Sequence, residues 1–475
     1  MAALNRDPQP LMSAAPATLE EHLAQAPLSR TQWLAWGLAA AGKFLEGLIV
    51  FIGGLVLPLL GEQGVHAPLQ RGAVAAAGLF GVLVGSLVFG GLTDRWGRRP
   101  VFIAEMGLLL VGLLLAGFSP DAGWLIAGLL VVGLALGADY PTAHLVIAES
   151  CPPRLRGRLV LGAFSFQALG VVSGTALVSL VLRLVPQPGA WRLFYLLPIL
   201  PVLLLTVLRL QLPESSHWLL SRGQHAAAQQ ALARLVERPG LSLLPSPGAA
   251  LPMPGMPWRE AMRQLVSPRW RRATTLAAVP WFLQDLATYG IGIFLPLLLG
   301  GLMGGASQAD PVVADLLGAR ASLFIDLALL AGFAAAIAAS DRWGRMPLQI
   351  SGFLGCGAGL VLAAAGLGSN DAPGQAIRLV FGLLIFQFMT NLGPNAQTYL
   401  LAGELFPTPV RGLAAGLAAA SGKLAAVLIA LLAPVLLERW GAGVLLLLLA
   451  CTSLLGALVT WGCRIETNGE ALNAR

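Results

Sequence analysis

The sequence predicts an all-α membrane protein in which twelve transmembrane helices form two pseudo-symmetric six-helix bundles. Hydrophobic residues make up 56% of the chain, charged residues only 11%, and the mean hydropathy is +0.76. Soluble domains carry roughly a quarter charged residues. The chain also repeats itself: Asp-Arg-Trp-Gly-Arg occurs at 94–98 and 341–345, and Glu-x-x-Pro-x-x-x-Arg-Gly at 149–157 and 404–412. Internal repetition in a membrane-embedded chain indicates two related halves.

Each predicted helix is an apolar stretch long enough to cross a bilayer, which takes about 20 residues. In order, the twelve stretches are 32–60, 72–93, 100–119, 123–148, 159–185, 190–210, 273–301, 319–339, 347–368, 375–401, 411–437 and 440–463. Several exceed what a straight helix needs, so we expect tilt or fraying at their ends.

Five segments follow from these spans. We expect a tail at 1–31, an N-terminal bundle at 32–210, a linker at 211–272, a C-terminal bundle at 273–463 and a tail at 464–475. The linker holds a candidate amphipathic helix near 224–237 and a Pro/Gly-rich stretch that is typical of flexible connections.

Basic residues set the expected orientation, because cytoplasmic loops accumulate Lys and Arg. With the N-terminus inside, the arginines left outside are Arg71, Arg183, Arg192, Arg320, Arg378 and Arg439. Both tails are then cytoplasmic in a cell or inner membrane, and the net charge of +7 is a topology signal that gives little support to nucleic-acid binding. The N-terminal tail lacks the apolar core of a cleaved signal peptide.

The only lysines, Lys43 and Lys423, both fall within predicted spans. A buried ammonium costs several kcal/mol unless it is paired or hydrated, so each is a functional hypothesis. At a rise of ~1.5 Å per residue, Lys423 lies about 18 Å from the basic boundary at Arg411. By the same count Asp285 is equally deep, and Asp139, Gln167 and Asn395 also lie near the midplane.

Trp281, Asp285 and Tyr289 recur every four residues and therefore share one face of a helix. Trp and Tyr normally favour the membrane interfaces, yet here they flank a midplane carboxyl group. A binding site explains this pattern better than a packing stripe, which stays the alternative.

The arrangement of spans and loops resembles the major facilitator superfamily. The motif Gly90-x-Leu92-x-Asp94-Arg95-x-Gly97-Arg98-Arg99 follows the second span, and part of it recurs after the eighth. Pro213-Glu214-Ser215 is similar to a pattern of the sugar-porter and phosphate-porter branches. The resemblance implies a secondary active transporter that works by alternating access, with no cofactor.

Further motifs resemble the phosphate:proton symporter branch: Gly137-Ala138-Asp139-Tyr140-Pro141, Gly393-Pro394-Asn395, Ser421-Gly422-Lys423 and the aromatic–acid face near 281–289. The resemblance implies that the anion is held by Tyr140, Gln167, Trp281, Asp285, Tyr289, Asn395 and Lys423. It also implies proton movement at Asp139. Independently of the resemblance, a tetrahedral oxyanion needs a positive charge and several hydrogen-bond donors, which this set provides.

The first span departs from that branch, because Ile49 occupies the position of an acid. Glu46 lies close to the same depth and is the candidate replacement in proton coupling, beside Asp139 and Asp285. Its alternative role is a structural pair with Lys43 at i, i+3.

The repeated charged motifs are candidates for a latch that closes the cytoplasmic side and biases a two-state equilibrium. This gating set is Asp94, Arg95, Arg98, Glu149, Arg156, Asp341, Arg342, Arg345, Glu404 and Arg411. Alternatively, the charges flank the spans and set topology only.

Other polar residues are weaker candidates. His144 could relay protons or be a satisfied core histidine. Asp326 is an intramembrane acid without an assigned partner, and Glu105 and Asp315 are expected at solvated membrane boundaries.

The leading prediction is proton-coupled symport of inorganic phosphate or a similar small anion by a monomer in the lipid bilayer. The alternatives are an organic acid, a sugar or another metabolite as cargo, or a receptor that binds without transporting. No nucleotide-binding loop, metal-ligand spacing or nucleophile motif favours an enzyme or a metal site.

Overall fold

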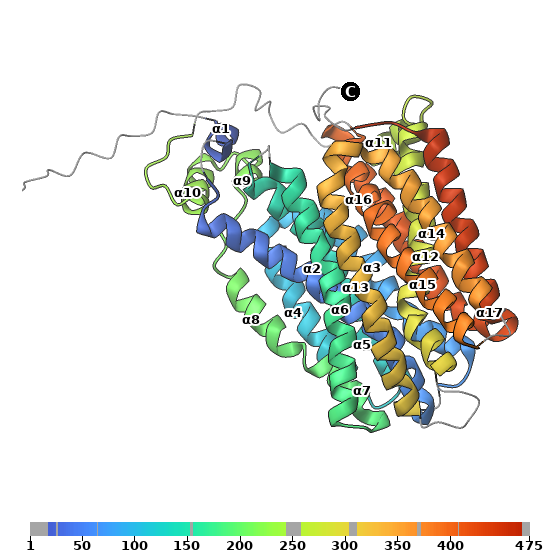
Figure 1. Cartoon of the computed structure of the whole chain (residues 1–475). Coiled ribbons are helices and arrows are strands. Elements are labelled where there is room, and N and C mark those ends of the chain that lie inside the picture. Colours follow the sequence, from blue (N-terminus) through green and yellow to red (C-terminus); the bar gives the residue numbers. More distant parts are fainter. Residues whose placement is uncertain are drawn as a thin grey trace, which may run out of the picture.

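The computed structural model describes residues 18–24, 27–63, 65–152, 155–243, 258–303, 311–367, 372–406 and 408–467 (Figure 1). These residues form long helices that run side by side, with the N-terminal half on one side of the molecule and the C-terminal half on the other. The predicted fold class, two six-helix bundles in a membrane protein, is confirmed.

The N-terminal half consists of α2 Arg30–Val56, α3 Pro68–Trp96, α4 Arg98–Gly117, α5 Ala122–Ser150, α6 Arg156–Leu184, α7 Trp191–Leu196 and α8 Ile199–Arg209. Short 3-10 segments, η1 Leu57–Gln63 and η3 Pro188–Ala190, extend α2 and precede α7. The predicted sixth span is thus divided into α7 and α8. Ser29 caps α2, because its hydroxyl accepts the backbone N–H of Gln32.

The C-terminal half consists of α12 Arg271–Met303, α13 Pro311–Trp343, α14 Arg345–Leu367, α15 Ala372–Leu392, α16 Pro394–Glu404 and α17 Thr408–Cys463. The predicted tenth span is broken between α15 and α16 at Gly393. Within α17, Gly441 has φ 78° and ψ 170°, which interrupts the helix between the last two predicted spans. Glycine adopts this positive φ without the penalty that a Cβ would bring.

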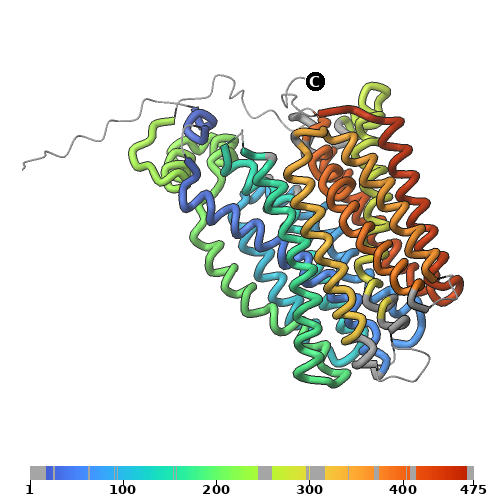
Figure 2. Tube along the Cα trace, in the orientation of Figure 1, coloured from blue at the N-terminus to red at the C-terminus, as the bar shows by residue number. Residues whose placement is uncertain are grey.

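Four short helices gather at one end of the bundle, which we name the linker end: α1 Leu19–Ala24, α9 Ser216–Ser221, α10 His225–Leu235 and α11 Trp258–Val266 (Figures 1 and 2). Leu19 and Leu23 of α1 pack with Leu232 and Leu235 of α10 in a small separate core. The opposite end of the bundle is called the far end below.

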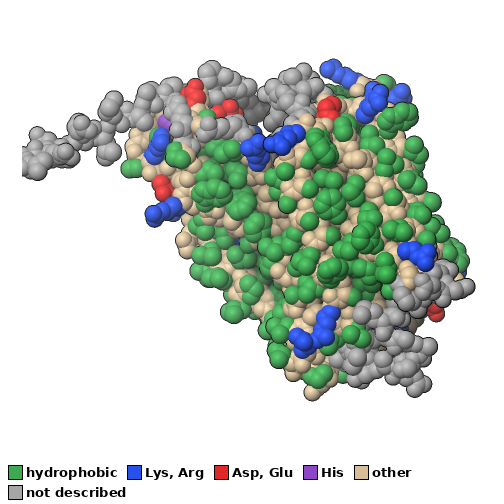
Figure 3. All heavy atoms as spheres, viewed as in Figure 1, with side chains coloured by type: hydrophobic (Ala, Val, Ile, Leu, Met, Phe, Trp, Pro, Cys, Tyr) green, Lys and Arg blue, Asp and Glu red, His purple; other side chains and the backbone are tan. Residues whose placement is uncertain are grey.

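Ten helical segments among the described residues are long and apolar enough to cross a membrane. One of them, Leu413–Cys463, contains the break at Gly441 and so holds two predicted spans, and α12 supplies the remaining one. On the face seen in Figure 3, hydrophobic side chains cover the length of the bundle while charged side chains gather near its ends. This distribution is the one that a bilayer requires.

The two halves pack directly through α3 with α17, α6 with α13, and α2 with α12. At the far end the backbones nearly touch: a Cβ added to Gly54 of α2 would lie 1.7 Å from the carbonyl oxygen of Ile293 in α12. Likewise, a Cβ on Gly72 of α3 would lie 2.2 Å from the carbonyl oxygen of Leu431 in α17. Glycine therefore permits the close approach of the halves at this end.

Candidate functional site

A small cavity of about 30 Å³ lies between the two halves in the middle of the bundle. Its lining includes all seven predicted substrate-binding residues: Tyr140, Gln167, Trp281, Asp285, Tyr289, Asn395 and Lys423. They come from α5 and α6 in the first half and from α12, α16 and α17 in the second. Residues far apart in the sequence thus converge on one cavity, although their roles there stay predictions.

Lys423 supplies the positive charge among the residues that line this cavity. Its Nζ donates a hydrogen bond to the hydroxyl of Tyr289 at 2.6 Å. The same nitrogen lies 3.7 Å from Asp285 Oδ2 and 3.9 Å from Glu46 Oε1. It also lies 5.6 Å from the centre of the Tyr140 ring, whose face attracts a cation. The buried ammonium is therefore shared by carboxyl groups from both halves.

The helical period of α12 places Trp281, Asp285 and Tyr289 on one face, as the sequence predicts. Gly422 on α17 lets this face come close: a Cβ there would lie 2.6 Å from the Trp281 ring and 2.9 Å from Asp285 Oδ2. The tight crossing of the two helices brings Lys423 level with the α12 acid. Asp285 Oδ2, the oxygen that lies 3.7 Å from Lys423 Nζ, accepts no hydrogen bond in the described structure.

Asn395 reaches the cavity because the helix breaks just before it. Pro394 is the first residue of α16, where its missing N–H leaves no helical bond unmade. Asn395 Nδ2 donates to Asn391 Oδ1 at 2.7 Å, and its Oδ1 accepts from Gln284 at 3.4 Å. The side-chain amides of Asn391 and Asn395 are therefore part of the cavity lining, and Gln284 contacts Asn395.

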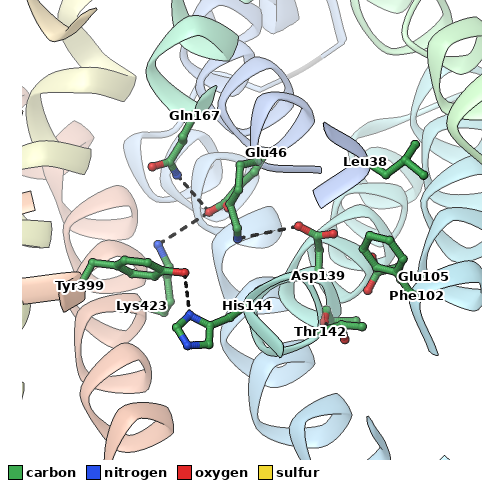
Figure 4. A network of polar contacts seen from close by, with 12 residues as sticks. Leu38, Glu46, Phe102, Glu105, Asp139, Thr142, His144, Gln167, Tyr399 and Lys423 are labelled. Carbon is green, nitrogen blue, oxygen red and sulfur yellow. Dashed lines mark hydrogen bonds and ion pairs between the residues drawn. The ribbon is translucent and has the colours of Figure 1, made fainter. Parts of the chain in front are cut away.

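Glu46 forms the structural pair that the sequence offered as one alternative and also contacts residues that line the cavity, while its role in proton coupling stays a prediction. It pairs with Lys43 at 3.0 Å, and its other oxygen accepts a hydrogen bond from Gln167 Nε2 at 3.1 Å. The same oxygen faces Lys423, so the acid belongs to a helix-internal pair and to the cavity network at once (Figure 4). Ile49, at the position of the missing acid, is buried and apolar.

The expectation of a solvated Glu105 is wrong, because this side chain is completely buried in an ion pair with Arg209 of α8. The Arg209 guanidinium also pairs with Asp139 at 2.9 Å and is itself fully buried. Lys43 approaches the other oxygen of Asp139 at 3.8 Å. Sequence reasoning missed Arg209, since an arginine at the end of a span normally reaches water. The side chain of Asp315, expected at the same kind of boundary, lies outside the described residues.

Asp326 of α13 does have partners, which the sequence could not assign. It accepts hydrogen bonds from Gln387 Nε2 at 2.9 Å and from the hydroxyl of Thr175 at 3.2 Å. Thr175 belongs to the first half and Asp326 to the second, so this bond crosses between them.

Tyr399, four residues after Asn395 on α16, is an aromatic contact that the sequence analysis overlooked. Its ring stacks on Phe164 of the first half with centroids 4.2 Å apart, and its hydroxyl lies 3.3 Å from His144 Nδ1. The Tyr140 ring meets it edge-on at 5.9 Å. Tyr399 lies four residues after Asn395, and this helical spacing could have predicted that both residues share one face of the helix. His144 is half-buried and has Tyr399 as a hydrogen-bond partner, and its role as a proton relay or as a structural histidine stays open.

The first gating motif forms a closed set of bonds at the linker end. Arg98 pairs with Glu149 at 2.9 Å, and Glu149 also accepts the hydroxyl of Ser215. Glu214 accepts the backbone N–H groups of Arg98 and Arg99 at the start of α4. A carboxylate here satisfies the unpaired N–H groups at a helix N-terminus and its partial positive charge.

The second half repeats this arrangement with different residues. Arg345 pairs with Glu404 at 3.3 Å, and Glu404 accepts the hydroxyl of Thr467 at 2.6 Å. Glu466 accepts the backbone N–H groups of Arg345 and Met346 at the start of α14. The ion pairs of Arg98 with Glu149 and of Arg345 with Glu404 therefore each join helices within one half. The gating hypothesis expected Glu149 and Glu404 to pair with the arginine clusters opposite, and a latch role for these residues stays a prediction.

The remaining gating candidates take no part in these two sets of bonds as far as the described residues show. Arg95 and Arg342 are exposed, and Arg156 is half-buried with its Nε unpaired. Asp94, Asp341 and Arg411 have side chains outside the described residues.

A two-half helical bundle with a charged cavity between its halves defines a multi-pass membrane transporter. The chain belongs to the Sugar (and other) transporter family, which it matches over residues 59–474. A transporter of this kind is not an enzyme.

Curated relatives carry several cargoes. The chain is 28% identical over 453 residues to the inner membrane metabolite transport protein YgcS of Escherichia coli, covering 94% of each chain. It is 27% identical to the niacin transporter NiaP of Acinetobacter baylyi, covering 84% of this chain and 85% of the relative. It is 28% identical to the probable inorganic phosphate transporter 1-3 of Oryza sativa, covering 84% of each.

Among solved structures, the chain resembles the xylose transporter XylE of E. coli in a partially occluded inward-open conformation. The TM-score is 0.73 at 19% identity, over 93% of this chain and 100% of the other. The proton:xylose symporter XylE bound to 6-bromo-6-deoxy-D-glucose gives a TM-score of 0.71 at 20% identity, over 94% and 98% of the two chains. At these identities the likeness establishes the fold.

Proposed function

We propose that this transporter moves inorganic phosphate or a similar small anion together with protons, by alternating access between its two halves. The observation that carries the proposal is Lys423, a buried ammonium that faces a cavity lined by hydrogen-bonding side chains. A neutral sugar needs no buried positive charge, whereas an oxyanion gains directly from one. Phosphate transporters among the relatives support the same cargo.

Within the cavity each polar group has a role in the proposal. Lys423 and the phenol of Tyr289 bind anion oxygens, Gln167 and Asn395 donate through their amides, and Asp285 accepts from a protonated oxygen of the anion. On arrival, the anion competes with Asp285 and Glu46 for the Lys423 ammonium. Asp285 and Glu46 then become the acids that take up protons, beside Asp139.

Proton coupling gives such a carrier its driving force. Each proton that enters at −100 mV contributes about 2.3 kcal/mol before any pH gradient is added. A monovalent anion opposes this by one charge, so the membrane potential helps accumulation only with more than one proton per anion.

The orientation and the oligomeric state are part of the same proposal. The linker end, which carries Arg98 and Arg345 at the starts of α4 and α14, faces the cytoplasm according to the distribution of basic residues. The two halves of one chain complete the cavity, so a monomer suffices.

The test is uptake of labelled phosphate by liposomes that contain the purified protein. Uptake should be faster with an inward proton gradient than without one, and absent from liposomes lacking protein. If the uptake rate does not depend on the proton gradient, the proposed proton coupling is wrong. If phosphate is not taken up at all, phosphate is not the substrate.

A small organic acid is the second candidate, favoured by the aromatic walls of the cavity. The Tyr289 ring stacks on Phe51 at 5.4 Å, and Trp281 faces Tyr140 at 6.4 Å. The niacin transporter among the relatives supports this reading. A thermal-shift panel of phosphate, sulfate, carboxylic acids and sugars separates the candidates, since a ligand at 100 times its Kd stabilises by about 2.7 kcal/mol.

A further inference from the structure

A glutamine in the wall of the cavity is oriented by a buried acid that stands behind it. Gln387 of α15 lines the cavity, and its Nε2 donates a hydrogen bond to Asp326 Oδ1 at 2.9 Å. Asp326 of α13 is buried and is not among the residues that line the cavity. A carboxylate only accepts hydrogen bonds, so the NH2 side of the Gln387 amide has to face Asp326. The carbonyl oxygen of the amide, Oε1, is left on the other side.

A proton on Asp326 would not reverse this orientation. The Thr175 hydroxyl has a single hydrogen, yet its oxygen lies 3.0 Å from the carbonyl oxygen of Val171 and 3.2 Å from Asp326 Oδ2. If Asp326 is protonated, its Oδ2 can donate to Thr175, which then donates to Val171. Asp326 Oδ1 accepts from Gln387 in both cases, so the amide points the same way.

The amide oxygen on the cavity side has no partner within the protein. Of the described residues, none donates a hydrogen bond to Gln387 Oε1. Gln167 in the first half is held in a similar way, because its Nε2 donates to Glu46 at 3.1 Å and no described group donates to its Oε1 (Figure 4). Each half therefore brings one amide oxygen to the cavity that can accept a hydrogen bond from a ligand.

These oxygens restrict the kind of anion that fits beside Lys423, the only basic side chain among the described residues that line the cavity. The lysine favours negative charge, whereas an amide oxygen needs a hydrogen-bond donor. Phosphate keeps at least one proton on an oxygen at neutral pH, and sulfate, which has the same shape, keeps none. Against sulfate the amide oxygen stays unpaired and faces another acceptor, which is costly in a buried site.

We propose that Asp326 is a positioning residue that fixes the Gln387 amide with its carbonyl oxygen toward the cavity, so that the site selects anions that also carry an O–H group. The inference rests on the proposed transport of a small anion and narrows its cargo. Phosphate is preferred to sulfate, and a hydroxy acid is preferred to the acid that lacks the hydroxyl.

The first experiment measures the dissociation constants of phosphate and sulfate by calorimetry on the purified protein. The pH lies above the second ionisation of phosphate, so that both anions are dianions and differ by one proton. The wild type should bind phosphate at least about tenfold more tightly than sulfate. In Asp326→Asn, the new side chain can donate as well as accept, so the Gln387 amide can turn over. We expect the preference for phosphate to fall about three- to tenfold, and an unchanged preference would overturn the proposal.

A second variant keeps the test available if Asp326→Asn does not fold. Gln387→Met has a side chain of similar length, removes the amide oxygen and leaves Asp326 in place. It should weaken the binding of phosphate more than that of sulfate, and so lower the preference about three- to tenfold. Equal weakening of both anions would contradict a role of this oxygen in selection.

Two controls separate positioning from a structural role. Thr175→Val removes the other bond of Asp326, which crosses between the halves, and keeps the bond to Gln387. Gln349→Met on α14 removes a buried polar pair with Thr460 in the second half. Both variants should keep the preference of the wild type for phosphate. A loss in Thr175→Val as large as in Asp326→Asn would mean that Asp326 acts as a link between the halves, and the proposal would be wrong.

A further pair of ligands distinguishes this inference from the proposed cargo. If the wild type does not bind phosphate, phosphate is not the substrate, and the same measurements are made with glycolate and acetate, which differ by one hydroxyl group. A preference for glycolate that falls in Asp326→Asn would support the role of Asp326. No preference, or binding of neither acid, would overturn it.

Discussion

The carboxylate of Glu46 in the first half and the ammonium of Lys423 in the second half meet at 3.9 Å in the middle of the molecule. Glu46 is held there by Gln167 and Lys43, so its position is fixed by its own half. Lys423 is held by Tyr289 and Asp285 in the other half. The pair therefore links two groups that are each held by their own half. Under the proposed function, an anion that enters between them would weaken this link.

Removing the ammonium should abolish transport of anions. In Lys423→Gln, both Asp285 and Glu46 lose their shared partner, and breaking a buried charge pair costs about 2–5 kcal/mol. We expect phosphate uptake to fall about a hundredfold or more, as measured in liposomes. Gln349→Met, far from the cavity, should retain uptake. Normal uptake by Lys423→Gln would exclude an anion site at this residue.

The contact between the halves at the far end should not tolerate a side chain at Gly54. A Cβ there meets the Ile293 carbonyl oxygen, whereas a Cβ on the adjacent Gly53 meets nothing within 4 Å. Gly54→Leu should therefore prevent the halves from closing at this end, because a packed interface cannot absorb an added side chain.

The measurement is uptake by the two leucine variants at equal amounts of protein in the membrane. Gly54→Leu should lose at least about tenfold in rate, while Gly53→Leu should match the wild type. Equal rates for both variants would show that this contact is not part of the cycle.

The carboxylates that cap α4 and α14 should contribute to stability. Glu214→Ala and Glu466→Ala each leave two helical N–H groups without their acceptor. Loss of a helix cap typically costs about 1 kcal/mol. We expect lower thermal unfolding temperatures in detergent for both variants, and no change for Glu438→Ala, whose side chain is exposed. Unaltered unfolding of the capping variants would contradict this assignment.

His217, on α9 at the linker end, should make stability depend on pH. Burial lowers the pKa of this imidazole below its usual value of 6.5, although nearby Glu149 opposes the shift. Its Nε2 has no hydrogen-bond partner in the described structure. Because the unfolded chain binds this proton more readily, the stability is full above pH 6.5 and falls as the pH drops through that value toward the lower folded pKa.

Thermal unfolding at about pH 7.5 and about pH 5.5 tests this, since the two values bracket the usual pKa of histidine. His217→Gln should lose less stability than the wild type between the two conditions. The control is His225→Gln on α10, where the imidazole is exposed and should not matter. Identical pH dependence in all three proteins would argue against His217 as the source.

Helical spacing and the rarity of lysine were enough to predict many of the residues that line the cavity. The spacing of Trp281, Asp285 and Tyr289 places them on one helix face whatever the neighbours are, and Lys423 is conspicuous because lysine is rare in this chain. The order of spans and their assignment to two halves likewise follow from apolar stretches and repeats, which are properties of adjacent residues.

Pairings between distant helices could not be predicted in the same way. Arg209 ends a span and resembles the many arginines that reach water. Only the packing of α8 against α4 reveals it as a buried partner of Glu105, with Asp139 of α5 within reach of the same guanidinium. Glu466 and Thr467 did leave a signal: they follow the last span of their half as Glu214 and Ser215 follow the sixth. That third repeat is weak because only the glutamate is identical.

Each half fastens its own charged loop: the carboxylate that caps the start of a helix and the arginine beside it belong to the same bundle. A rocking motion of one bundle against the other could therefore leave both fastenings intact. Each half would then move as a rigid body. The resistance to this motion would come from contacts between the halves, among them the hydrogen bond between Thr175 and Asp326 and the stacking of Phe164 on Tyr399.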